Sequence, residues 1–194
     1  MTRTLAALMM TVTALGAAFS AAPALAQTAK GPTAVVSPQP LPIDDSRPRV
    51  FLGGSIDMGG APDWQAAMTS ALADMDVVIL NPRRPDWNPN WRPEVDEPEF
   101  RRQVEWELAA LESADVIVMY FAPGTQSPIS LLEMGLHARG GKLIVLAPQG
   151  FWRKGNVDIT AQAYGVKQVQ SLPELTAAVR EALSAAATQA RFAR

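Results

Sequence analysis

The sequence contains no cysteine and a single histidine, His137, among its 194 residues. Without cysteine the chain can form no disulfide, no cysteine-ligated zinc site and no thiolate nucleophile. A Ser-His-Asp triad would depend on His137 alone, which leaves little room for that arrangement. The chain also lacks the lysine-bearing P-loop that cradles nucleotide phosphates. We therefore expect no metal ion and no cofactor.

Net charge is also nearly absent, because 17 Lys and Arg residues oppose 19 Asp and Glu residues, giving −2. No broad basic field results, so nucleic acid is not an expected partner. Hydrophobic residues make up 48% of the chain and charged residues 19%, which is typical of a globular protein with a packed core. The length favours a single domain.

The N-terminus has the order of a secretory signal peptide. Arg3 precedes an apolar stretch over residues 5–19, and the small-x-small run Ala24-Leu25-Ala26 follows. We predict a signal peptide over residues 1–26, cleaved after Ala26, and a periplasmic or secreted protein without a stable membrane span. The alternative is an uncleaved anchor, which the shortness of the apolar stretch disfavours. No cysteine follows the cleavage site, which excludes a bacterial lipoprotein.

The predicted mature chain divides into two parts. Residues 27–48 contain Pro32, Pro38, Pro40 and Pro42 and show no apolar period, which predicts a flexible, Pro-rich leader. Globular patterning begins at residue 49, and we predict one domain over residues 49–190.

Within that domain, apolar runs alternate with helical patterns. Strands are predicted over residues 50–52, 77–80, 116–121, 143–147 and 167–169, and helices over residues 62–75, 100–111, 128–138 and 173–187. Continuous apolar strands separated by helices favour a parallel sheet covered on both faces. The predicted fold class is α/β, a five-stranded parallel sheet in a flavodoxin-like or Rossmann-like three-layer sandwich.

Ligands of such sheets bind beyond the carboxyl ends of the strands, at the point where the strand order reverses. The loops over residues 53–60 and 122–127 follow the first and third predicted strands and are rich in Gly, Pro, Ser and Thr. The first loop supplies four candidate substrate-binding residues: Gly53, Gly54, Ser55 and Asp57. Its glycine pair permits either a close backbone approach or simply a tight turn.

Two glutamates are candidates for catalysis because each falls near an apolar stripe of a predicted helix. Glu107 lies on the stripe formed by Phe100, Val104, Leu108 and Leu111. A carboxylate on an inward face is costly unless it is paired or functional. The alternative is a glutamate that forms an ion pair with a nearby arginine at the edge of the core.

Glu133 repeats this pattern on the next helix. It lies about 40° from Ile129 at the α-helical period, beside a predicted buried stripe that also includes Leu132 and Leu136. Two carboxylates can divide the nucleophile and acid/base roles of glycoside chemistry, with their pKa values pushed apart in a dry pocket. A paired core glutamate is again the alternative.

The loops around these helices offer further candidates. Ser127 reads as an N-cap before Pro128, with Ser130 one turn further on, and a helix N-terminus of this kind suits phosphate. The alternative is a capped turn that binds nothing. In the loop over residues 81–91, Arg83 or Arg84 could meet a phosphate and Trp87 could stack on a base. Asn81, at the start of this loop, is a further candidate substrate-binding residue. The alternative there is a Pro-stiffened loop packed by its own tryptophans.

The sequence from residue 49 to about 166 resembles the nucleoside 2-deoxyribosyltransferase family. The resemblance rests on residues 50–55, 81–84, 105–107, 114–115, 127–135 and 151–157. It implies a parallel sheet of five strands and a retaining mechanism. The family nucleophile, in a Glu-x-Gly segment, corresponds to Glu133-Met134-Gly135, and the carboxylate that handles the base corresponds to Glu107. Gly53 corresponds to the glycine that lines the sugar site.

One departure from the family pattern bears on the substrate. Members that act on free nucleosides have an Asp six residues before the nucleophile, where this chain has Ser127. Related hydrolases of deoxynucleoside 5′-monophosphates use Ser in this region to hold phosphate, which Asp would repel. The resemblance also implies a homo-oligomer that shares active-site residues, with residues 156–158 as the candidate region.

We therefore expect an enzyme that cleaves the N-glycosidic bond of (deoxy)nucleosides or their 5′-monophosphates through Glu133. Its partner is a small nucleoside or nucleotide, and the sugar passes to another base or to water. The alternatives are a non-catalytic module that senses or sequesters nucleotides and, less favoured, a structural periplasmic domain.

Overall fold

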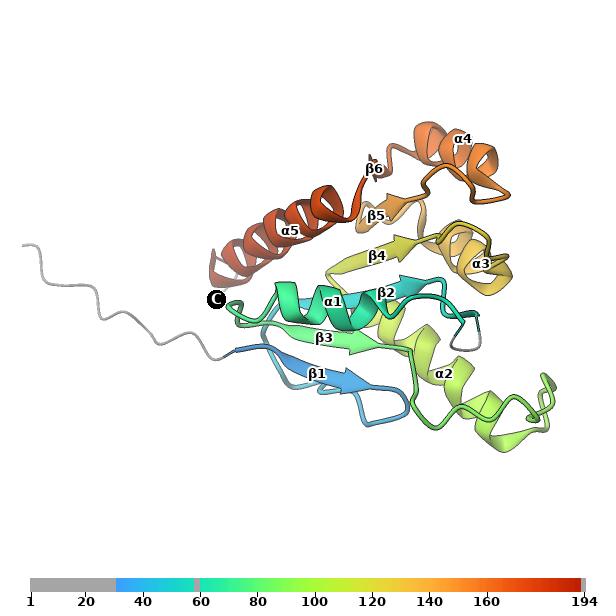
Figure 1. Cartoon of the computed structure of the whole chain (residues 1–194). Coiled ribbons are helices and arrows are strands. Elements are labelled where there is room, and N and C mark those ends of the chain that lie inside the picture. The colour runs from blue at the N-terminus through green and yellow to red at the C-terminus, as the bar shows by residue number, and fades with distance from the viewer. Residues whose placement is uncertain (1–30, 58–59, 193–194) are drawn as a thin grey trace, which may run out of the picture.

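A computed structural model describes residues 31–57 and 60–192. The predicted signal peptide over residues 1–26 lies outside these residues. The described chain forms one parallel sheet in the order β1-β3-β2-β4-β5-β6. Its strands are β1 (Thr33–Val36), β2 (Arg49–Gly54), β3 (Val78–Asn81), β4 (Val116–Tyr120), β5 (Leu143–Leu146) and β6 (Lys167–Val169) (Figure 1). The predicted α/β class and parallel sheet are confirmed, with β1 as a sixth strand beyond the five expected.

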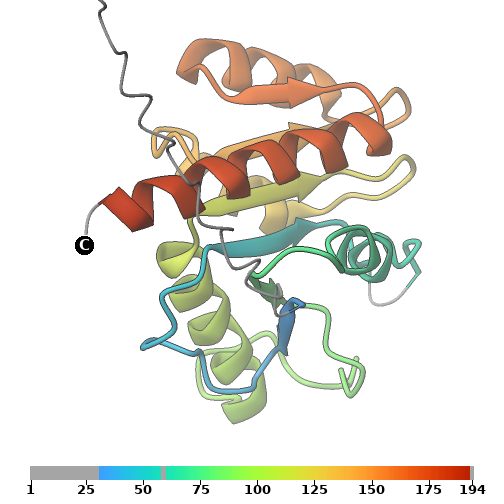
Figure 2. The same ribbon diagram turned by 90° about the vertical axis from the view of Figure 1, so that its left-hand side faces the viewer.

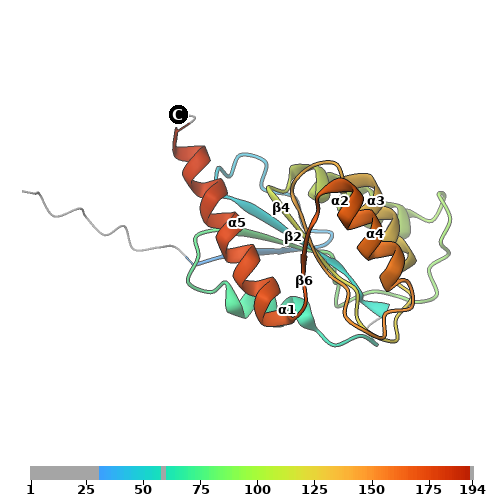
Figure 3. The same ribbon diagram turned by 90° about the horizontal axis from the view of Figure 1, so that it is seen from above.

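Helices cover both faces of this sheet. They are α1 (Trp64–Ala71), α2 (Pro98–Ser113), α3 (Pro128–His137), α4 (Lys154–Tyr164) and α5 (Leu172–Phe192). Seen from above, α1 and α5 lie on one face and α2, α3 and α4 on the other (Figure 3). Each side has its own apolar cluster against the central strands. The central strands β4 and β5 are buried along their whole length, as their unbroken apolar runs predict. Helix α4 was not predicted.

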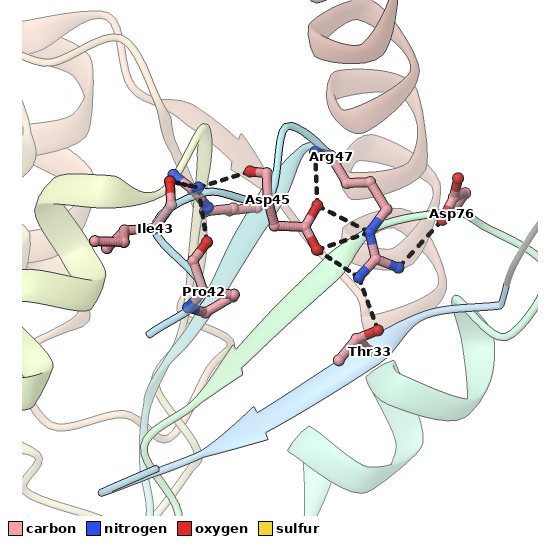
Figure 4. Close-up of polar contacts among 7 residues, drawn as sticks. Thr33, Pro42, Ile43, Asp45, Arg47 and Asp76 are labelled. Carbon is pink, nitrogen blue, oxygen red and sulfur yellow. Dashed lines mark hydrogen bonds and ion pairs between the residues drawn. The ribbon is translucent and has the colours of Figure 1, made fainter. Parts of the chain in front are cut away.

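The segment expected to be a flexible leader instead joins the fold from Thr33 onward. Strand β1 pairs in parallel with β3 at the edge of the sheet (Figure 2). The Arg47 guanidinium binds the Asp45 carboxylate at 2.7 Å, the Thr33 hydroxyl at 2.8 Å and Asp76 at 3.2 Å (Figure 4). The Arg49 side chain donates to three backbone carbonyls, of residues 42, 43 and 45. These contacts fix a proline-rich segment that has little apolar pattern of its own, so the predicted domain start at residue 49 falls too late.

The predicted apolar face of α2 is correct only in part. Leu111 is buried and Phe100 and Val104 are half-buried, but Leu108 is 48% exposed. The other buried residues of the helix are Gln103, Trp106 and Ala110. The Trp106 indole N–H donates to the Gln39 carbonyl, so the helix is turned toward the segment after β1. That contact partner could not be expected while the segment was read as a leader.

The predicted apolar face of α3 is wrong as well. Ile129, Leu132 and Leu136 are each about 60% exposed, and the buried residues of the helix are Ser130, Glu133 and Met134. Helix α3 therefore packs through a face that carries polar groups, and its apolar stripe points away from the sheet. Periodicity finds a stripe but does not say which side of a helix meets the core.

No helix among residues 31–57 and 60–192 is long and apolar enough to cross a membrane.

Candidate active site

The strand order reverses between β2 and β4, which are neighbours although β3 lies between them in the chain. Chain segments leave both strands at their carboxyl ends and run side by side, since the Ser55 N–H donates to the Tyr120 carbonyl at 2.8 Å. This is the place where open parallel sheets bind their ligands. The predicted site residues at the ends of β2 and β4 meet here.

Glu133 is a buried carboxylate without a compensating charge. Its side chain extends from α3, and the residue is 7% exposed. Among the described residues, no hydrogen bond or ion pair reaches its oxygens, so the paired core glutamate of the alternative interpretation is not what the structure has. Burial, with the nearby Glu107 charge as the second cause, raises the pKa of Glu133 to about 8.

Glu107 is the second carboxylate of the site. It comes from α2, on the same face of the sheet as α3 (Figure 3). Burial raises its pKa to about 7, against a hydrogen bond that Gln103 Nε2 donates to its Oε1 at 2.8 Å. No arginine pairs with it within the described chain, so this alternative also does not apply.

The negative charge of Glu107 opposes the ionisation of Glu133. With the pKa of Glu107 raised to about 7 and that of Glu133 to about 8, the two carboxyl groups hold one proton between these pH values, and the higher pKa places it mainly on Glu133. A pair with one acid and one carboxylate is the arrangement that glycosyl transfer requires.

Three hydroxyl groups gather at the start of α3, the helix that carries Glu133. Ser55 Oγ lies 2.7 Å from Thr125 Oγ1 and 2.6 Å from Ser127 Oγ. The Ala122 N–H donates to Ser55 Oγ, and Thr125 Oγ1 donates to the Ala122 carbonyl. Ser127 occupies the predicted N-cap position, but with a φ of 45° it makes no side-chain cap bond. The first turn of α3, which includes buried Ser130, thus begins with N–H groups that its own cap does not satisfy.

Gly53 and Gly54 serve the contact between strands. A Cβ on Gly54 would lie 2.2 Å from the Tyr120 carbonyl oxygen, and its φ of 129° disfavours any other residue. A Cβ on Gly53 would lie 2.9 Å from side-chain atoms of Met119 and Phe51. Of the two expectations for this pair, the close backbone approach is the one observed.

The loop after β3 is held mainly by its own contacts. The Arg84 side chain is 2% exposed and binds the carboxylates of Asp86 and Glu99, at 2.9 Å and 3.3 Å. The Trp87 and Trp91 rings meet edge to face at 5.2 Å, with the Arg84 guanidinium 4.8 Å from the Trp91 ring centroid. This is the self-packed loop of the alternative interpretation, and contact between Trp87 and a base stays a prediction.

Three other predicted binding residues lie around the loop after β2. The Arg83 guanidinium donates to the carbonyls of Ala61 and Pro62, at 3.1 Å and 3.4 Å, so it connects the loops after β2 and β3. Asn81, at the end of β3, accepts the Arg83 backbone N–H through its side-chain oxygen. Asp57 is exposed and has a φ of 49°. Contact of these residues with a substrate stays a prediction.

A cavity of about 310 Å³ opens next to this site, between α3 and α4. Its lining includes Leu131, Met134 and Gly135 from α3, together with Asn156 and Val157 from α4. Neither carboxylate lines it, although Met134 and Gly135 directly follow Glu133 in the chain. The cavity is therefore a neighbour of the carboxylate pair and not its substrate pocket. Within the described residues, no three His, Asp or Glu side chains gather as metal ligands.

Gln103, which is buried and hydrogen-bonded to Glu107, was not among the predicted site residues. The sequence did contain a signal, because residues four apart on a helix are neighbours and a Gln can bind a carboxylate there. Gln65 of α1 was not predicted either, and its buried Nε2 has no hydrogen-bond partner in the described structure. The sequence does not distinguish a buried glutamine that is hydrogen-bonded from one that is left without a partner.

The open parallel sheet defines an α/β protein of the class that binds ligands at the switch point of the sheet. Its family follows from the sequence: the family model described as nucleoside 2-deoxyribosyltransferase like matches residues 47–151, more than half of the chain, and the chain belongs to this family. Membership indicates a glycosyl-transfer type of enzyme with small nucleoside substrates, at the level of the family.

A structural relative has the same fold. A solved structure described as a conserved protein from Enterococcus faecalis V583 has a TM-score of 0.52 and 11% sequence identity, and the match covers 70% of this chain and 98% of that chain. At that identity the likeness concerns the fold alone. No curated protein matches the chain.

Proposed function

We propose that this protein cleaves the N-glycosidic bond of (deoxy)nucleosides or their 5′-monophosphates, with Glu133 as the nucleophile. The observation that carries the proposal is the Glu133 carboxyl group, 7% exposed and without a cationic partner among the described residues. Ionising such a buried, unpaired group costs several kcal/mol of effective desolvation. A protein keeps such a group where it serves chemistry, and a second carboxylate nearby supplies the partner role.

The chemistry needs one proton on the pair. Ionised Glu133 attacks C1′ of the sugar and forms an ester bond, while the C1′–N bond breaks and its electron pair goes to the base. Protonated Glu107 gives its proton to the departing base. Water or a second base then attacks C1′ and gives its proton to the Glu107 carboxylate, while the ester bond breaks and Glu133 is released as the carboxylate. In the free protein the higher pKa of Glu133 makes the form with the proton on Glu107 the minor one, and the positive charge that develops at C1′ in the transition state stabilises ionised Glu133.

The hydroxyl cluster supports a 5′-monophosphate as the substrate. Ser127, which is hydrogen-bonded to the buried Ser55 and Thr125, carries a partly exposed hydroxyl next to the N-terminus of α3, where the helix dipole also favours negative charge. We expect Ser127→Asp to lower base release from monophosphates at least about tenfold, since like charges repel, and to spare free nucleosides. Ser184→Asp on α5 is the matched control for the added charge, because it is far from the site in the chain and exposed. Equal losses on both substrate classes would contradict this preference.

The outer surface of α3 supports self-association. Ile129, Leu132 and Leu136 form an exposed apolar ridge on α3. The cavity between α3 and α4 has a mixed lining, in which Leu131, Met134 and Val157 are apolar and Arg153, Asn156 and Thr160 are polar. A ridge next to a groove can fit its own copy across a two-fold axis. Leu132→Lys is expected to reduce the particle mass in light scattering, whereas Ala187→Lys near the end of α5 is not. A monomeric wild type would refute the association.

The test of the proposed function is base release by wild type and Glu133→Gln. Both proteins are assayed chromatographically on a panel of deoxynucleosides, ribonucleosides and their 5′-monophosphates. We expect release by wild type and a loss of at least about 10³-fold in the variant, since the nucleophile is absent. Glu105→Gln, an exposed glutamate on α2, is the matched control. Ligand binding without release by wild type would instead identify a sensing module, and undiminished release by Glu133→Gln would refute the mechanism.

A further inference from the structure

The side-chain amide of Gln103 makes three hydrogen bonds within the described structure. Its Nε2 donates to the Pro82 carbonyl at 3.0 Å and to Glu107 Oε1 at 2.8 Å. Its Oε1 accepts from the Ser37 hydroxyl at 2.5 Å. The residue is 5% exposed and Ser37 is 3% exposed, so water does not compete for these groups.

These partners fix the orientation of the amide. A carbonyl oxygen can only accept, so the side of Gln103 that faces Pro82 must be the NH₂ group. A flipped amide would place its oxygen against the Pro82 carbonyl and against Glu107, leaving buried acceptors unsatisfied. The Ser37 hydroxyl donates to the amide oxygen on the opposite side, which agrees with the orientation that the Pro82 carbonyl fixes. Gln103 therefore presents an N–H to Glu107 in every state of the site.

An N–H aimed at Oε1 decides where a proton on Glu107 can reside. An oxygen that accepts this hydrogen bond cannot also direct a proton along the same line. When Glu107 is protonated, its proton is consequently held on Oε2. Building on the proposed function, we infer that Gln103, anchored by Ser37 and the Pro82 carbonyl, is a positioning residue that keeps the acidic proton of Glu107 on Oε2, ready for the departing base.

The chain segments that build this anchor come from three parts of the fold. Ser37 follows β1, Pro82 follows β3, and Gln103 lies on α2, one turn before Glu107. The Ser37 N–H also donates to the Asn81 carbonyl at 3.0 Å, which keeps the serine at the end of β3. Ser37, in the segment predicted to be a flexible leader, is thus connected to Glu107, the acid of the proposed reaction, through two successive hydrogen bonds.

The first test compares leaving groups in kinetics of wild type and Gln103→Met, which keeps the length of the side chain and removes its hydrogen bonds. A 7-methylpurine nucleoside releases a neutral base without needing a proton, whereas an unmodified purine nucleoside needs one. We expect kcat to fall about 10–100-fold on the unmodified substrate, as for a displaced general acid, and less than about threefold on the methylated one. Gln162→Met, at an exposed position of α4, is the matched control. Equal losses on both substrates would overturn the inference.

The second test does not depend on turnover. The Glu107 carboxyl is titrated by carbon-13 NMR in wild type, Gln103→Met, Ser37→Ala and Ser37→Thr. Loss of a hydrogen bond to the ionised form raises the pKa of Glu107 in Gln103→Met, by about one pH unit or a factor of ten. Ser37→Ala is expected to shift it in the same direction and Ser37→Thr, which keeps the hydroxyl, to restore it. An unchanged titration in Gln103→Met would overturn the role of Gln103, whereas absence of base release by wild type would count against the proposed function alone.

Discussion

Replacement of Glu133 by Gln is expected to stabilise the protein, and by more at high pH than at low pH. Gln has nearly the shape of a protonated glutamate and stays neutral at every pH. In wild type, burial raises the pKa of Glu133 from 4.5 to about 8, so the folded state holds a proton that the unfolded chain releases. The favourable contribution of protonated Glu133 is therefore complete below pH 4.5 and is lost as the pH rises toward about 8.

The magnitude follows from this range of pH. A tenfold change in proton affinity corresponds to about 1.4 kcal/mol, so the shift from 4.5 to about 8 sets an upper value near 4–5 kcal/mol. Part of this free energy comes from repulsion by the Glu107 charge, so the value for Glu133 alone is smaller. We expect the stability difference between Glu133→Gln and wild type to grow by about 2–4 kcal/mol from pH 5 to pH 8.5.

Urea unfolding at the two pH values measures this difference directly. Glu105→Gln serves as the control, because Glu105 is 60% exposed and pairs with Arg101 on the surface of α2. The control should show less than about 0.5 kcal/mol of change between the two pH values. A stability gap for Glu133→Gln that is the same at pH 5 and pH 8.5 would refute the description of Glu133 as a buried, uncompensated carboxylate.

Three further predictions concern the reaction, the sheet and the N-terminus. Base release should follow a bell-shaped pH profile with its maximum near pH 7–8, because the pKa values of Glu107 and Glu133 lie at about 7 and about 8 and the reaction needs one proton on the pair. A rate that is level from pH 5 to pH 9 would contradict this. Gly54→Ala should destabilise the fold by about 3 kcal/mol or more and lower the midpoint of thermal unfolding by more than about 10 °C, since its Cβ would collide with the Tyr120 carbonyl. Gly140→Ala is the milder comparison, and equal effects of the two substitutions would argue against the collision. After expression with export, intact-mass measurement should find a chain that begins at Gln27, and retention of residues 1–26 would disprove the predicted cleavage.

The sequence predicts the centre of the fold better than its edges. Strands β2 to β5 are unbroken apolar runs, and only burial on both faces of a sheet accounts for such runs. Strand β1 has four residues among prolines, and its place in the sheet depends on the distant contacts of Arg47. Helix α4 contains Gly155 and β-branched residues, so its local preference for helix is weak, and packing of Val157 and Ala161 stabilises it.

The candidate site shows the same division. Glu133 was predicted to face inward because it lies beside Ile129, yet Glu133 is buried and Ile129 is 59% exposed. The expectation of a buried Glu133 was right while the reason given for it was wrong, because the helix turns its other side to the sheet. The Gln103 contacts could not be predicted, since they depend on where Ser37 and Pro82 lie in space. Spacing along a helix finds neighbours on that helix and not across the fold.

The position of β1 also decides where a stable fragment of this protein can begin. The residues Thr33 to Val36 cover the outer edge of β3 with parallel backbone hydrogen bonds. A truncated chain that starts at Arg49 would leave that edge as a row of unpaired N–H and C=O groups, open to strands of other molecules. Expression of the domain should therefore retain the residues from Gly31 onward, and shorter versions are expected to aggregate.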